Sequence, residues 1–170
     1  VHCDEIWIRR GVRVNPMNKH QKSGGDLFAC CLPRCVISPS AVLLERSLLS
    51  ECGGFDESLP ACEDYDLWLR ICSRYSVLYL GQALLRKYGG HEDQLSSKYW
   101  GMDRFRIQAL DKLLRSGTLK REQALAARAM LVRKSTIMMN GASKRKNTEL
   151  AQKYRRLIEN YSLGAEEEQQ

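Results

Sequence analysis

Residues 53–70 read GGFDESLPACEDYDLWLR, and this stretch decides how the chain is organised. Two glycines and a turn with a proline are followed by the acids Glu63, Asp64 and Asp66, and then at once by an aromatic and aliphatic run. Acids in a first helical turn interact favourably with the exposed amides and the positive end of the helix dipole. The stretch therefore predicts a helix that begins at Glu63 and runs to about Tyr75.

A helical projection separates the three acids. If each residue turns by about 100°, one face of the helix is apolar and contains Leu67, Trp68, Ile71, Cys72 and Tyr75. Asp66 falls on the opposite face, four residues before Arg70, so we expect a solvent-facing ion pair there. Asp64 lies near the middle of the apolar face, and we expect its carboxylate to point toward the interior or a cleft.

An inward carboxylate at the start of a helix has two interpretations. Asp64 can be only a first-turn acid that stabilises its own helix, since the free amides satisfy it. The same amides also keep a carboxylate ionised, as a general base must be. The pattern of residues leaves both interpretations open.

The composition is that of a globular protein rather than a membrane-spanning one. The chain has 170 residues, enough for a domain with a hydrophobic core. No apolar run approaches the roughly 20 residues of a membrane-spanning helix. The first residues, VHCDEIWIRR, lack the apolar centre of a signal peptide. We therefore expect a cytoplasmic protein.

Seven cysteines raise the question of metal binding. An odd number in a chain without an export signal suggests reduced thiols. Cys30, Cys31 and Cys35 are close enough in sequence for a zinc site, but there is no C-x-x-C pair and no histidine at ligand spacing. These features favour small buried hydrophobic residues over a zinc site.

The first 96 residues mix strand and helix signals, whereas the rest of the chain reads as helix. We expect a β-hairpin over 5–15 with its turn at Arg10–Gly11, and then a short helix over 26–32. β-rich segments follow at 35–39 and 40–45, and a short helix over 46–52 stops at Gly53. Buried strands are expected over 76–81 and 83–88, followed by a loop over 89–96. Helices are expected from about Ser97 to Gly117, from Thr118 to Gly141 and over 147–161, followed by a disordered tail. This predicts an α/β portion over 1–96, a helical extension over 97–162 and a tail over 163–170.

The last third of the chain carries the whole excess of positive charge. Residues 1–100 contain 12 Lys or Arg and 12 Asp or Glu, whereas residues 101–170 contain 15 and 8, which accounts for the net charge of +7. A basic helical surface of this kind can be an ordinary solvated face, or it can bind an anionic membrane surface or an acidic protein partner. Nucleic acid is not expected, because the aromatic residues near these charges have the spacing of a helix core.

Residues 37–75, ISPSAVLLERSLLSECGGFDESLPACEDYDLWLRICSRY, resemble the second half of the catalytic domain of family 2 glycosyltransferases, which have the GT-A fold. The resemblance extends more loosely to CDEIWIRRGVRVN (3–15), to GGHEDQLS (89–96) and to KYWGMDRFRIQAL downstream, over roughly the first 115 residues. It implies an enzyme that transfers a sugar from a nucleotide-sugar donor to a hydroxyl of a glycan or lipid-linked acceptor, with inversion of configuration.

The resemblance also implies roles for particular residues. Asp64 corresponds to the catalytic base of the Glu-Asp pair, Glu63 to a neighbour of the acceptor, and Gly53–Gly54 to a turn that passes close to the sugar pocket. His91 is a candidate ligand for the metal or the diphosphate. A divalent metal, Mg or Mn, is expected for the complete domain, because it offsets the charge of the diphosphate leaving group.

We expect the other half of such an enzyme to be missing from this sequence. We find neither nucleotide-binding βαβ units nor an Asp-x-Asp metal motif, and the acids of Asp64-Tyr65-Asp66 lie about 160° apart on a helix. We therefore expect a partial GT-A fold that does not catalyse transfer unaided. The alternative is a non-catalytic binding module that uses the basic helices 97–162 to contact an acidic protein or the inner face of a membrane.

Overall fold

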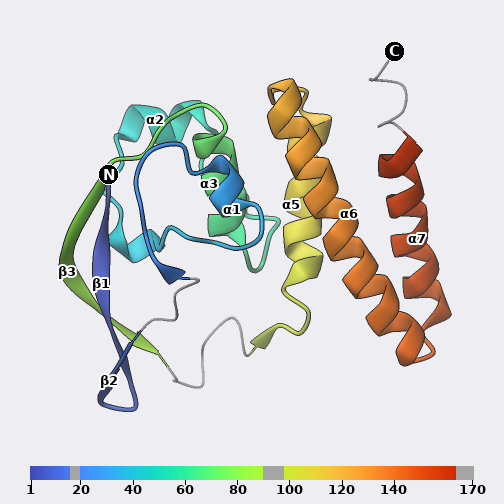
Figure 1. Cartoon of the computed structure of the whole chain (residues 1–170), viewed down its shortest axis with the longest axis horizontal. Helices are drawn as coiled ribbons and strands as arrows, with labels where there is room; N and C mark the ends of the chain where they lie inside the picture. Colours follow the sequence, from blue (N-terminus) through green and yellow to red (C-terminus); the bar gives the residue numbers. More distant parts are fainter. Residues whose placement is uncertain (16–19, 90–97, 164–170) are drawn as a thin grey trace. The chain divides into compact units, whose positions relative to one another are not determined.

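A computed structural model describes residues 1–15, 20–89 and 98–163 and shows two compact units. The first comprises Val1–Trp100 and combines a small sheet with short helices, and the second comprises Gly101–Gln170 and is helical (Figure 1). The mixed α/β architecture of the first unit agrees with the fold class predicted from the sequence.

Three strands form the sheet of the first unit. β1 (His2–Arg9) lies between β2 (Val12–Val14) and β3 (Tyr79–Gly89); it pairs antiparallel with β2 and parallel with β3 (Figure 1). The turn between β1 and β2 has positive φ at both Arg10 (50°) and Gly11 (77°), as a tight two-residue hairpin turn requires. The predicted hairpin is therefore confirmed.

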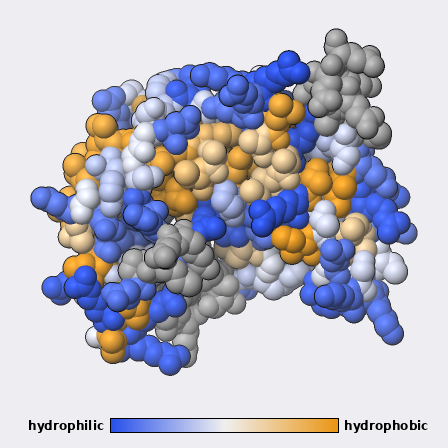
Figure 2. Space-filling view, in the orientation of Figure 1, coloured by the Kyte–Doolittle hydropathy of each residue, from blue (hydrophilic) through white to orange (hydrophobic). Residues whose placement is uncertain are grey.

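The prediction of two buried strands at 76–81 and 83–88 is wrong. This region forms the single strand β3, and Leu80, Leu84 and Tyr88 are exposed by 46%, 60% and 62%. Hydrophobic surface is visible at the left edge of the molecule, where β3 lies (Figure 2). Leucine and tyrosine indicate a strand, but they do not reveal whether another layer covers its face.

Short helices cover the rest of the first unit. They are α1 (Phe28–Cys31), the 3-10 turn η2 (Pro39–Ala41), α2 (Arg46–Glu51) and α3 (Glu63–Cys72). The prediction of β-rich segments at 35–39 and 40–45 is wrong: Pro39 opens the 3-10 turn, and Val42 makes only an isolated bridge to His2. The helix at 46–52 is confirmed, and Gly53 follows it with a φ of +77°.

The core of the first unit is built around α3. Four residues of its predicted apolar face are buried, with Leu67, Trp68, Ile71 and Cys72 all at most 4% exposed. The prediction that the helix runs to about Tyr75 and buries that residue is wrong, because α3 ends at Cys72 and Tyr75 is 38% exposed. Tyr65 is also buried, and its hydroxyl donates a hydrogen bond of 2.6 Å to the carbonyl of Leu32, just after α1. The apolar run in the sequence therefore fixes the orientation of α3 and of the acids in its first turn.

The second unit consists of α5 (Asp103–Arg115), α6 (Arg121–Lys144) and α7 (Thr148–Leu163). Its buried residues include Phe105, Leu110, Leu113, Ala127, Leu131, Met138 and Tyr154. The buried Lys134 of α6 is neutralised by Asp103 at the start of α5, with 2.9 Å between Nζ and Oδ1. α6 continues past Gly141, where the prediction ended it, and the glycine leaves room for the guanidinium of Arg145. None of the described helices combines the length and apolar character needed to span a bilayer.

His2 makes the stability of the first unit depend on pH. Its ring is 1% exposed, Nε2 donates to the carbonyl of Ser23 at 2.8 Å, and Nδ1 has no hydrogen-bond partner among the described residues. Burial, aided by the nearby Lys22, lowers the pKa of His2 below its ordinary 6.5, although the bond to Ser23 opposes this. The unfolded chain therefore binds the proton more readily than the folded one.

We predict that the contribution of neutral His2 to the free energy of unfolding is complete above about pH 6.5 and decreases as the pH falls below that value. Urea unfolding followed by tryptophan fluorescence reports on this unit, because Trp7, Trp68 and Trp100 all belong to it. A His2→Gln variant should lose the slope between about pH 6.5 and about pH 5. An unchanged slope in that variant would assign the pH dependence to another group.

Candidate active site

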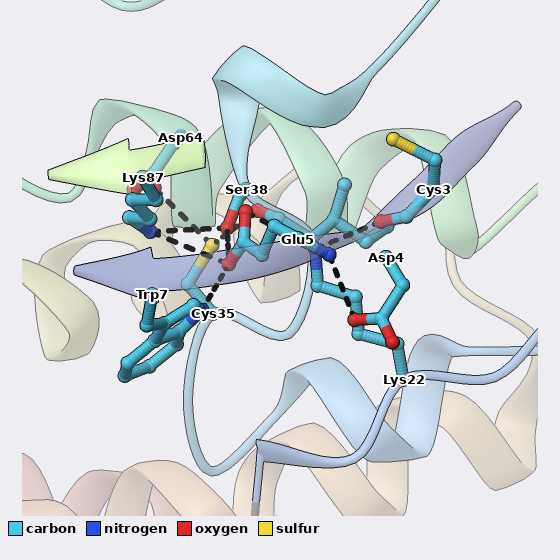
Figure 3. A network of polar contacts seen from close by, with 10 residues as sticks. Cys3, Asp4, Glu5, Trp7, Lys22, Cys35, Ser38, Asp64 and Lys87 are labelled. Carbon is cyan, nitrogen blue, oxygen red and sulfur yellow. Dashed lines mark hydrogen bonds and ion pairs between the residues drawn. The ribbon is translucent and has the colours of Figure 1, made fainter. Parts of the chain in front are cut away.

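Asp64 lies in the first turn of α3 with a half-buried side chain. Oδ1 accepts a hydrogen bond of 2.7 Å from the backbone N–H of Tyr65, and Oδ2 accepts one of 3.2 Å from the thiol of Cys35 (Figure 3). These two hydrogen bonds fix the direction of the carboxylate. The first turn thus presents an oriented carboxylate that can accept a proton.

An unusual backbone conformation precedes this turn. Cys62, the residue before α3, has φ +63° in the left-handed region and is buried. This conformation costs a residue with a Cβ about 1–2 kcal/mol. Such strain persists only where the surroundings enforce it, and it is concentrated at functional sites. The geometry at Cys62 sets the direction in which α3, and with it Asp64, enters the fold.

Cys35 keeps its proton and so can act as a donor to Asp64. Burial, together with the negative charge of Asp64, raises the pKa of the Cys35 thiol well above its ordinary value. Its sulfur also lies 3.1 Å from the carbonyl of Ile37, an alternative acceptor. All seven cysteines are free and five are buried, while Cys30 is exposed.

Glu5 is the centre of a second polar cluster, on the central strand β1 (Figure 3). Its Oε1 accepts hydrogen bonds from the indole of Trp7 at 2.8 Å and the hydroxyl of Ser38 at 2.9 Å. Lys22 lies 3.3 Å from Oε2, and Lys87 of β3 lies 3.8 Å from Oε1. Its side chain is only 1% exposed, so the cluster replaces the lost hydration of the carboxylate.

The partners of Glu5 keep it ionised despite its burial. Burial alone would raise its pKa, but Lys87, Lys22 and the hydrogen bonds from Ser38 and Trp7 outweigh this effect and lower the pKa below the ordinary 4.5. The stability that Glu5 contributes is therefore present above about pH 4.5 and is lost as the pH falls below its folded-state pKa.

The short segment 35–38 holds both carboxylates. Cys35 donates a hydrogen bond to Asp64, and Ser38 donates one to Glu5, so the same stretch of backbone fixes the two acids.

The predicted pair of Asp66 and Arg70 exists, but the expectation that Asp66 faces solvent is wrong. The carboxylate is 1% exposed and accepts hydrogen bonds from Nη2 and Nε of Arg70 at 2.7 Å and 3.0 Å. Arg70 also donates to the carbonyls of Cys52 and Gly54, the latter at 2.7 Å. The turn at 52–54 thus packs on this face of α3, which a projection of the helix alone cannot reveal.

The structure places the other predicted site residues as follows. Glu63 is half-buried beside Asp64 in the first turn of α3. Gly53 and Gly54 both have positive φ, 77° and 67°, and Arg70 holds their turn against the same helix. His91 lies outside the described residues. Within 1–15, 20–89 and 98–163, no group of three or more His, Cys, Asp or Glu side chains is arranged to hold a metal ion.

Sequence reasoning missed the polar partners of this region, namely Glu5, Lys22, Cys35, Ser38 and Lys87. The available signal is Glu5 itself, an acid within the strand sequence HCDEIWIR, where a buried charge requires partners. The sequence does not identify those partners, because they come from distant segments.

Comparisons with known proteins identify the family of the chain. The family model described as glycosyltransferase-like family 2 matches residues 26–116, just over half of the chain, and these residues include Asp64, Cys35, Ser38, Lys87 and the Gly53–Gly54 turn. The α/β unit with an acid pair opening α3 is therefore of the glycosyltransferase class, and the chain belongs to glycosyltransferase-like family 2.

One curated relative is an uncharacterised glycosyltransferase of Rickettsia felis, 34% identical over 67 residues. The match covers 39% of this chain and 11% of the relative, so the chain spans about a tenth of that protein's length. No solved structure matches the chain.

Proposed function

We propose that Asp64 is the catalytic base of an inverting glycosyltransferase that uses a nucleotide-sugar donor. The carboxylate takes the proton from an acceptor hydroxyl as that oxygen forms a bond to the anomeric carbon. The bond from that carbon to the nucleoside diphosphate breaks on the opposite face, and the electron pair leaves with the diphosphate. The observation that carries this proposal is the half-buried carboxylate held by Cys35 and the Tyr65 amide at the start of α3.

The remaining assignments complete the same site. Glu63 is proposed to contact the acceptor, a glycan or lipid-linked sugar, and the Gly53–Gly54 turn is proposed to pass close to the transferred sugar. His91 is a proposed ligand of the diphosphate or its metal. A divalent metal, Mg or Mn, belongs to this proposal only for a complete domain, because the described residues supply no set of metal ligands.

We further propose that residues 1–96 form the acceptor-side half of a GT-A domain, to which the helices 97–162 are appended, with 163–170 as a tail. The exposed side chains of Leu80, Leu84 and Tyr88 on β3 support this, because β3 is an edge strand of the described sheet, and exposed large apolar residues at a sheet edge favour pairing with a further segment. A cytoplasmic location, with the basic helices near the inner face of the membrane, is part of the same proposal.

The test is a nucleoside-diphosphate release assay on the chain joined to the segment encoded directly upstream of it. Nucleotide-sugars are offered singly, with and without glycan and lipid-linked acceptors. We expect release that requires both a donor and an acceptor, and a product with inverted anomeric configuration by NMR. A folded fusion that binds no nucleotide-sugar, or a product that retains configuration, would contradict the proposal.

A further inference from the structure

The orientation of the Asp64 carboxylate depends on a contact from a distant part of the chain. One contact is local, because the amide of the next residue, Tyr65, donates 2.7 Å to Oδ1. The terminal torsion of an aspartate side chain is broad, so a bond to one oxygen leaves the plane of the carboxylate undetermined. The thiol of Cys35, 29 residues earlier in the chain, lies 3.2 Å from Oδ2 and fixes that plane (Figure 3).

The single proton of the Cys35 thiol has two acceptors within reach. Its sulfur lies 3.2 Å from Oδ2 of Asp64 and 3.1 Å from the carbonyl oxygen of Ile37. A hydrogen bond is stronger when its acceptor is ionised. When Asp64 is ionised, as a general base must be, its carboxylate therefore attracts the thiol proton more strongly than the neutral carbonyl does.

Cys35 belongs to a segment that is anchored on both sides of it. On one side, the hydroxyl of Tyr65 donates a hydrogen bond of 2.6 Å to the carbonyl of Leu32. On the other side, the hydroxyl of Ser38 donates one of 2.9 Å to Glu5. The backbone that carries Cys35 is therefore held at both ends, and its thiol is presented to Asp64 from a fixed position.

The anchor at Glu5 is itself rigid. Its buried carboxylate is contacted by Lys22 and Lys87, and Lys87 also donates a hydrogen bond of 3.1 Å to the hydroxyl of Ser38. Glu5 lies on β1, outside the residues 26–116 that the family model matches. Buried polar networks with several partners hold their members in a defined geometry. The place of the segment 35–38 is therefore set by the central strand of the sheet.

We propose that Cys35 is a positioning residue for the base Asp64. Its thiol donates to Oδ2 and takes no part in making or breaking bonds. An ionised carboxylate offers about four acceptor positions, so the contacts with Cys35 and Tyr65 leave room for the hydroxyl of the sugar acceptor. The half-buried side chain of Asp64 leaves it accessible to that hydroxyl. This inference rests on the proposed role of Asp64 in sugar transfer.

The experiment compares Cys35→Ser with Cys35→Ala and Cys35→Val in the chain joined to its upstream segment. Serine keeps a donor, whereas alanine and valine do not. We expect Cys35→Ala and Cys35→Val to lower kcat at least about tenfold with unchanged donor affinity, because they remove a hydrogen bond to a charged group and leave the base misplaced. Cys35→Ser should retain more turnover than either. Nucleoside-diphosphate release measures kcat, and calorimetry measures donor binding.

A role in packing alone gives the opposite order of the variants. A buried cysteine then behaves as a small hydrophobic residue, so alanine or valine would replace it better than the polar serine. Cys30→Ala is the matched control, because it removes an exposed cysteine within the family-matched residues and should leave kcat unchanged. Urea unfolding establishes that each variant is folded. Loss of folding in both Cys35→Ala and Cys35→Val would overturn the proposal, because the thiol would then be needed for packing.

The Asp64→Asn background separates failure of this inference from failure of the proposed function. A residue that acts only through Asp64 contributes nothing once the base is absent, so adding Cys35→Ala to Asp64→Asn should lower the residual kcat less than about twofold. A tenfold loss in both backgrounds would overturn the positioning role. Full turnover of Cys35→Ala beside an impaired Asp64→Asn would overturn that role alone. Full turnover of Asp64→Asn would overturn the proposed function, and this inference with it.

Discussion

Replacing Asp66 by asparagine is expected to destabilise the first unit by about 3 kcal/mol, the lower part of the range for breaking a buried ion pair. The carboxylate is almost fully buried, and its partner Arg70 is only 20% exposed. Without the charge of Asp66, the guanidinium of Arg70 would remain partly buried without its counter-ion. The loss also loosens the carbonyls of Cys52 and Gly54, which Arg70 holds against α3.

Urea unfolding followed by tryptophan fluorescence measures this effect, because all three tryptophans belong to the first unit. Glu57→Gln, which removes one exposed carboxylate from the preceding turn, is the control and should change the free energy of unfolding by less than about 0.5 kcal/mol. The double variant Asp66→Leu/Arg70→Met should be more stable than Asp66→Asn, because it leaves no unpaired charge. A loss below about 1 kcal/mol for Asp66→Asn would be typical of a surface pair and would contradict the burial of Asp66.

The sequence predicts α3 and its acids because the signals that define them are local. Helical periodicity and the acids of the first turn act within a few residues, so Leu67, Trp68 and Ile71 are buried as expected. Asp66 is different: its burial depends on the turn at 52–54, more than ten residues away. Propensity and periodicity describe one element at a time, so they do not predict which of its residues are buried by another part of the chain.

The sheet shows the same limit. The β1–β2 hairpin follows from a local turn signal, whereas the exposure of β3 depends on which layers cover it. The partners of Glu5 and Asp64 come from five separate segments, and the parallel pairing of β1 with β3 brings Lys87 to Glu5. Parallel pairing joins distant parts of a chain, so no window of sequence contains this cluster.

Replacing Asp64 by asparagine is expected to lower the rate of sugar transfer about 10³-fold, within the range of general-base catalysis. The side chain keeps its shape and an oxygen that can accept from the Tyr65 amide, so donor binding should persist. The assay is nucleoside-diphosphate release by the chain joined to its upstream segment, with nucleotide-sugar binding measured separately by calorimetry. Glu57→Gln, an exposed acid within the family-matched residues, is the control and should retain full turnover.

The same variant separates the two interpretations of Asp64. A helix-stabilising acid contributes to the free energy of folding, whereas a catalytic base lowers the free energy of the transition state for sugar transfer. An acid that only stabilises its helix contributes about 0.3–1 kcal/mol to folding and nothing specific to the transition state. A base acts when the acceptor proton is transferred, so its loss lowers kcat while folding and donor affinity change little. Normal turnover with a small loss of stability would therefore leave Asp64 as a helix-stabilising residue. A large loss of turnover in a variant that folds and binds the donor would identify Asp64 as the base that accepts the proton of the acceptor hydroxyl.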